Sequence, residues 1–151
     1  MPLARIDLIK GKPAQYRQAV GDAVYTAMVE ILKAPKDDRF QVIAEHDASN
    51  FIFDPNFFDI TRSNDVIFVQ LTLAEGRTLE QKRGFYKRLV DDLHDRLGVR
   101  KEDVFVSLVG TGREDWSFGR RGVPREILKT QAQTEESVAI FVPLAAKGAE
   151  W

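Results

Sequence analysis

Residues 65–110 read DVIFVQLTLAEGRTLEQKRGFYKRLVDDLHDRLGVRKEDVFVSLVG, and this stretch decides the fold. It opens on a β-prone apolar run over 65–73 and closes on another over 104–109. Between the two runs, apolar residues recur at helical spacing and would form one buried stripe. The stretch therefore predicts a strand, a helix and a second strand.

The limits of this helix are marked by residues that favour helix ends. Thr78 and Gln81 have the spacing of a capping box, with Thr78 as N-cap. Gly98 follows the last apolar position of the stripe and suits a C-cap. We therefore expect the helix to lie between Thr78 and Gly98.

The first part of the chain repeats this pattern at one constant offset. A strand is expected over 2–9, an amphipathic helix over roughly 14–33 and a strand over 40–45, with Pro35 ending the helix. The aligned positions include Gly11 with Gly76, Val24 with Leu89, Met28 with Leu93, Asp38 with Asp103, and Phe40 with Phe105. The chain thus reads as two β-α-β units, over about 2–46 and about 65–110.

Two such units predict an α/β (α+β) fold. A strand–helix–strand crossover is right-handed and makes its two strands parallel, so the units together give a four-stranded sheet with both helices on one face. The other face is left without a helix, although Phe68 and Val106 belong to strands with apolar residues on both faces. Oligomerisation is the simple way to cover that face.

Two segments lie outside the repeats of what we take to be a single domain over 1–151. Residues 47–64 hold four of the ten phenylalanines, which must be buried on the chain's own sheet or against a neighbour. A C-terminal extension over about 120–151 contains the apolar run 138–142, which suits an added strand or a contact with another subunit.

Composition excludes several classes of function. The net charge of −1 argues against nucleic-acid and anionic-membrane binding. The chain has no cysteine, which excludes disulfides and thiolate chemistry. Of its two histidines, we expect His94 on the solvated side of its helix and His46 in a structural role, so no metal site is expected.

The chain also lacks the usual signals for cofactors and for export. It has no phosphate-binding loop, dinucleotide fingerprint or nucleophile elbow, and no cofactor is expected. The charged start MPLARIDLIK does not fit a secretory signal, and no apolar run is long enough for a membrane span. A cytoplasmic protein is the expectation.

The unusual chemical group is at the N-terminus, where Pro2 follows Met1. A small second residue permits removal of the methionine, which would leave Pro2 with a free secondary amine. Such an amine can act as base, acid or nucleophile, and apolar surroundings or a nearby arginine favour its neutral form. If Met1 is retained, Pro2 is an amide and can do none of this.

In this setting the chain resembles the tautomerase superfamily, most closely its malonate semialdehyde decarboxylase-like branch. The resemblance covers roughly residues 2–120. The stretches that carry it are Pro2-Leu3, Ile6 to Ile9 with Gly11, Pro35 with 37–41, Gly76 to Thr78 with 80–82, 103–106, and 115–119.

The resemblance implies a homotrimer that binds a small carboxylate-bearing substrate. It makes Pro2 the catalytic amine and gives Asp38 the role of the aspartate that influences the proline or activates water. Arg77 matches the arginine that holds the substrate carboxylate, and its planar guanidinium suits that task. Trp116 and Phe118 match an aromatic wall of the pocket.

One departure from the family pattern bears on the reaction. The decarboxylase pattern has a second arginine where this chain has Glu75. We therefore expect a keto-enol tautomerase of a small 2-oxo acid, with Pro2 as general base. Decarboxylation or hydration of a 3-oxo acid is the alternative, and a non-catalytic trimeric binding protein of the same fold is the second. No ligand motif supports a regulatory module.

Overall fold

The computed structural model describes residues 2–119. The chain divides after Thr111 into two compact units, and the first contains both predicted repeats. The second unit is described only from Gly112 to Gly119. The predicted extension over about 120–151, with its run 138–142, lies outside the described residues, so the single-domain interpretation stays a prediction.

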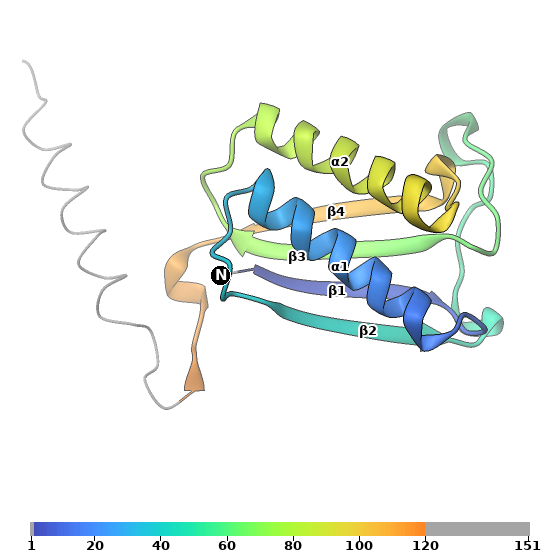
Figure 1. The fold of residues 1–151 in the computed structure, drawn as a ribbon, viewed down its shortest axis with the longest axis horizontal. Helices are drawn as coiled ribbons and strands as arrows, with labels where there is room; N and C mark the ends of the chain where they lie inside the picture. Colours follow the sequence, from blue (N-terminus) through green and yellow to red (C-terminus); the bar gives the residue numbers. More distant parts are fainter. Residues whose placement is uncertain (1, 120–151) are drawn as a thin grey trace, which may run out of the picture. The chain divides into compact units, whose positions relative to one another are not determined.

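The first unit is a four-stranded sheet with two long helices (Figure 1). Its strand order is β2-β1-β3-β4. In chain order the elements are β1 (Pro2–Ile9), α1 (Ala14–Glu30), β2 (Phe40–His46), β3 (Ile67–Ala74), α2 (Leu79–Leu97) and β4 (Val104–Thr111). In the alignment of the repeats, the first residues of β3 and α2 correspond to the first residues of β1 and α1. The α/β class and the duplication are therefore confirmed.

Pairing within each repeat differs from pairing between the repeats. β1 and β2 are parallel, and so are β3 and β4, as the crossover rule predicts. The two repeats meet through β1 and β3, which run antiparallel in the centre of the sheet. One end of the sheet therefore gathers the starts of β1 and β2 with the ends of β3 and β4.

Both helices have local reasons for their limits. Thr78 and Gln81 form the predicted capping box at the start of α2, and Gly98 ends it in the left-handed conformation at φ 68°. α1 ends at Glu30, earlier than the predicted residue 33. The chain turns away after α1 because Lys33 is left-handed at φ 57° and the N–H of Ala34 donates to the carbonyl of Met28.

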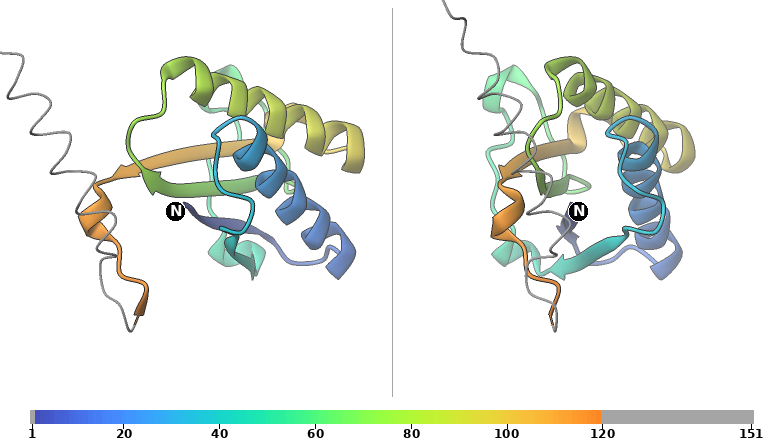
Figure 2. Two further views of the ribbon diagram at one scale, coloured as in Figure 1. Left: turned by 60° about the vertical axis from the view of Figure 1, so that its left-hand side comes forward. Right: turned by 90° about the vertical axis from the view of Figure 1, so that its left-hand side faces the viewer.

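The core lies between the helices and one face of the sheet, and Figure 2 shows both helices on that face. Every second residue of β1 and β3 is buried in this core, as expected for strands that helices cover on one face. The largest fully buried side chains include Phe85, Ile6, Met28, Ile67, Leu71, Leu89 and Leu93. Burial of this apolar stripe is the main stabilising contribution to the unit.

The second face of the sheet is covered only in part. Phe51 of the loop over 47–64 is 7% exposed and packs on Phe68, with ring centroids 4.6 Å apart. Phe57 and Phe58 of the same loop remain 53% and 80% exposed. The chain's own sheet therefore buries only some of the phenylalanines of this loop.

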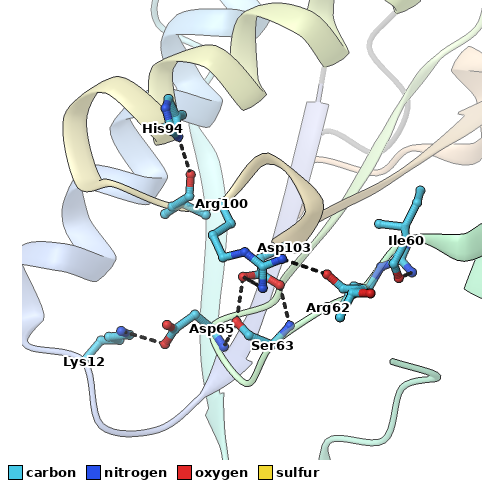
Figure 3. Close-up of polar contacts among 10 residues, drawn as sticks. Lys12, Ile60, Arg62, Ser63, Asp65, His94, Arg100 and Asp103 are labelled. Atoms are coloured by element: carbon cyan, nitrogen blue, oxygen red, sulfur yellow. Dashed lines mark hydrogen bonds and ion pairs between the residues drawn. The ribbon is translucent and has the colours of Figure 1, made fainter. Parts of the chain in front are cut away.

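At the sheet end where β3 and β4 begin, a buried carboxylate joins two loops (Figure 3). Asp103 is fully buried and accepts hydrogen bonds from the backbone N–H and the hydroxyl of Ser63, each at 2.6 Å. Arg100 lies 3.8 Å from the same carboxylate. Lys12 pairs nearby with Asp65 at 2.8 Å. These contacts hold the loop before β3 against the start of β4.

Removal of this carboxylate should weaken the fold. Replacing Asp103 with Ala leaves two donors of Ser63 without their acceptor, and we expect a loss of about 2–3 kcal/mol in the free energy of unfolding. Urea denaturation followed by circular dichroism measures this loss. Glu102→Ala, an exposed acidic neighbour, is the control and should change little; equal losses in the two variants would contradict the structural role of Asp103.

Candidate functional site

The sheet brings three of the predicted site residues to one end. Pro2 begins β1, and the parallel register of Leu3 with Phe40 places the start of β2 beside it. Asp38 comes two residues before that strand. β3 runs antiparallel to β1 and ends at the same edge, where Arg77 follows it by three residues. Residues from three distant parts of the sequence are thus gathered by strand pairing alone.

Pro2 lies inside the unit on the face of the sheet that carries the helices. Its residue is buried, and it alternates along β1 with Ala4 and Ile6 of the core. Across the sheet Pro2 pairs with Leu73 of β3, and Leu73 pairs in turn with Gly110 of β4. These three residues form a row along one edge.

A cavity of about 340 Å³ opens beside Leu73 and Gly110 of this row, and Pro2 itself is not among its lining residues. Leu73, Leu108 and Gly110 contribute to its lining from β3 and β4. Glu75, Arg77 and Lys82 bring charged side chains to it. A cavity lined by apolar residues and a few charged groups is a common form of small-molecule site.

Arg77 is half-buried and bonded to the backbone of two elements. Its Nε donates to the carbonyl of Leu32 at 3.3 Å, and its Nη1 donates to the carbonyl of Ala74 at 2.6 Å. The guanidinium therefore joins the turn after α1 to the end of β3. Arg77 both lines the cavity and stabilises the sheet end that forms it.

Asp38 is half-buried in the turn that precedes β2, where its N–H donates to the carbonyl of Pro35 at 3.2 Å. The structure places it at the same sheet end as Pro2, but not among the residues that line the cavity of one chain. Its predicted influence on Pro2 stays a prediction.

Trp116 and Phe118 belong to the second unit, which is described by itself. They follow a short 3-10 helix, Arg113–Asp115. Their rings are stacked with centroids 6.4 Å apart and planes at 3°. Trp116 is half-buried and Phe118 is 41% exposed. Their role as a pocket wall stays a prediction.

Both histidines are in surroundings that agree with their sequence interpretation. His46 Nε2 lies 2.7 Å from Asp7 Oδ1, and its ring lies beside Phe51. His94 is exposed, with Nδ1 2.9 Å from the carbonyl of Val99.

Among residues 2–119, no cluster of three or more histidines and carboxylates is placed to hold a metal ion. In the same part of the chain, no helix is long and apolar enough to cross a membrane.

Lys82 is a cavity residue that the sequence did not single out. The signal was available, because Lys82 lies one helical turn after the N-cap Thr78, and its N–H donates to the Thr78 carbonyl. A side chain there lies near the residues that follow β3. In the sequence, Glu75 stood out only as a departure from the decarboxylase pattern. Its place in the cavity lining was not predicted.

The chain matches two family models and a bacterial relative. A family model described as "Tautomerase enzyme" matches residues 38–119, and a second model of the same description matches residues 2–59. The probable tautomerase YusQ of Bacillus subtilis is 40% identical over 119 residues, which are 79% of this chain and 94% of the relative.

Solved structures agree with these matches. A malonate semialdehyde decarboxylase, whose structures concern its decarboxylase and hydratase activities, is 31% identical with a TM-score of 0.76, covering 85% of this chain and 98% of its own. A second malonate semialdehyde decarboxylase, inhibited by 3-bromopropiolate, is 34% identical with a TM-score of 0.74, covering 89% and 96%. A fused 4-OT protein, a symmetric trimer, shares the fold at 21% identity and a TM-score of 0.68, covering 83% and 98%.

The backbone contacts of Arg77 predict a stability effect that is separate from any catalytic one. Arg77→Ala removes hydrogen bonds to Leu32 and Ala74, so we expect the free energy of unfolding to fall by about 1–2 kcal/mol. Chemical denaturation measures it, with Arg83→Ala, an exposed arginine on α2, as the matched control. A loss no larger than that of the control would show that these bonds contribute nothing.

Proposed function

Because the chain belongs to the tautomerase enzyme family, in its malonate semialdehyde decarboxylase-like branch, we propose that it is a keto-enol tautomerase of a small 2-oxo acid. The observation that carries the proposal is the place of Pro2. It is buried at the start of β1 and is paired with Leu73, which lines the charged cavity.

Pro2 would act as the general base. After removal of Met1 its secondary amine is free, and in the neutral form it can take a proton from the carbon next to a carbonyl. Its core neighbours support the neutral form, because apolar surroundings penalise the ammonium ion. Return of the proton to the other end of the enol system completes the tautomerisation. In the related decarboxylase, a variant with its first residue changed from proline to alanine has also been solved.

Arg77 would bind the carboxylate of the substrate and hold its acidic carbon near Pro2. A guanidinium offers two parallel donors to a carboxylate, which fixes orientation as well as position. Lys82 adds a second positive charge to the cavity lining and supports the attraction of an anion. Orientation of this kind supplies much of the rate enhancement in proton transfer.

The remaining candidate residues have supporting roles in this proposal. Asp38, at the same end of the sheet as Pro2, would influence the proline or activate water. Trp116 and Phe118, with their stacked rings, would form an aromatic wall of the pocket. Both assignments are supported by the family resemblance of the stretches that contain them.

A second candidate is decarboxylation or hydration of a 3-oxo acid. The similarity to a protein with decarboxylase and hydratase activities favours it. In that reaction Pro2 would be cationic and would polarise a carbonyl or assist the loss of CO₂. The acidic Glu75 in the cavity would change the handling of the substrate carboxylate in either reaction. A non-catalytic binding protein of this fold remains the interpretation if Pro2 has no free amine.

We also propose that the chain is a homotrimer. Leu3, Phe40, Val42 and Phe105 are exposed on the strands, although they are large and apolar. Exposed apolar surface of this kind marks an interface. A trimeric protein of the same fold supports three copies as the assembly.

Loss of the Pro2 ring should abolish tautomerase activity. With phenylenolpyruvate as substrate, we expect the enol absorbance to decay quickly with the native protein and at the background rate with Pro2→Ala, because the variant lacks the secondary amine. N-terminal mass spectrometry of the native protein should show a chain that starts at Pro2. Retained Met1 would rule out both enzymatic interpretations.

Arg77→Ala should raise the KM for phenylenolpyruvate by about ten- to a hundredfold, because one charge-assisted carboxylate contact is lost. Arg83→Ala is again the control, and assays are kept at a temperature where both variants are folded. An unchanged KM in folded Arg77→Ala would remove Arg77 from the substrate site. Release of CO₂ from malonate semialdehyde without enol turnover would favour the decarboxylase candidate instead.

A further inference from the structure

Glu75 is an exposed residue that lines the cavity, and backbone pairing sets its position. It directly follows β3, and its N–H donates to the carbonyl of Thr111 at 3.0 Å, which extends the pairing of β3 with β4. Its side chain lies over Gly110, where a Cβ atom would come 3.1 Å from the Cγ of Glu75. The absence of a side chain at position 110 therefore makes room for this carboxylate.

The strand register shows how Glu75 lies relative to Pro2. Pro2, Leu73 and Gly110 are paired in a row across β1, β3 and β4. Two strand spacings separate Pro2 from Gly110, or about 10 Å. If the acidic carbon of a substrate lies against Pro2, as the proposed function requires, a distal group that extends past Leu73 would enter the cavity that Glu75 lines.

The charges of the cavity favour a substrate with one negative charge. Arg77 and Lys82 bring positively charged groups to the lining, and Glu75 brings a negatively charged one. Within residues 2–119 Glu75 forms no ion pair, so its own charge is not cancelled by direct contact. Arg77 and Lys82 attract one carboxylate, whereas the second carboxylate of a dicarboxylate would approach Glu75 and be repelled.

We propose that Glu75 determines specificity by rejecting a second carboxylate, so that the substrate is a 2-oxo acid with one carboxylate and an uncharged distal group. The inference rests on the proposed function, because it takes this cavity as the substrate site. A carboxylate only accepts hydrogen bonds, so Glu75 also tolerates a distal hydroxyl or N–H group. Specificity then comes from repulsion of the wrong ligand as well as attraction of the right one.

Two unreactive acids of the same carbon skeleton test the proposal. Crotonate and fumarate both have four carbons, and differ in a methyl group against a second carboxylate. Dissociation constants are measured by NMR titration of the native full-length chain, Glu75→Gln, and Glu80→Gln as the control. Glu80 carries the same charge in the first turn of α2, is exposed, and is not part of the cavity lining.

In Glu75→Gln we expect fumarate binding to strengthen about tenfold relative to crotonate, because one like-charge repulsion is removed. Glu80→Gln should keep the ratio of the native protein. An unchanged ratio in Glu75→Gln, or an equal change in both glutamate variants, would overturn the proposal.

Turnover of phenylenolpyruvate, measured on the same samples, separates this proposal from the proposed function. If the native protein shows no turnover but Glu75→Gln shifts the binding ratio, tautomerase activity fails and the charge selection by Glu75 stands. If turnover occurs and depends on Pro2 but the ratio does not move, the selection by Glu75 fails alone.

Discussion

The antiparallel pairing of β1 with β3 is the constraint on which the rest of the structure depends. It joins the two repeats in the centre of the sheet and sets Pro2 opposite Leu73. The start of the chain is thereby placed at the end of β3, beside the turn that carries Glu75 and Arg77. Neither repeat alone would bring these groups together. The two strands of one repeat are parallel, so the start of one strand lies at the opposite end of the sheet from the end of the other.

Because of the same antiparallel pairing, equivalent residues of the two repeats lie at opposite ends of the sheet. The two ends now differ in structure. In the alignment of the two repeats, Lys12 corresponds to Arg77, Asp103 to Asp38, and Ile67 to Pro2. Asp103 is fully buried and bonded to Ser63, whereas Asp38 is half-buried at the open end. One end is thus closed by a structural hydrogen-bond network, and the other keeps a cavity with charged walls.

The local structure could be predicted from the sequence because its signals act over a few residues. The capping box at Thr78 and the left-handed Gly98 fixed the limits of α2, and the spacing of apolar residues fixed the strands and the duplication. The direction of β1 relative to β3 could not be predicted, since the apolar pattern of a strand is the same in either orientation. The early end of α1 depended on Lys33, a residue with no special preference for the left-handed conformation.

The site was predictable to a smaller extent. Pro2, Asp38 and Arg77 were singled out and share one sheet end, but only the tertiary structure shows that Lys82 and Glu75 line the cavity with Arg77.

The most direct test of Pro2 as the general base is a ¹⁵N NMR titration of the chain labelled at proline. We expect a free amine at Pro2 that is largely neutral at pH 7, as a general base must be. An amide at Pro2, or an amine that stays fully protonated at pH 7, would contradict it.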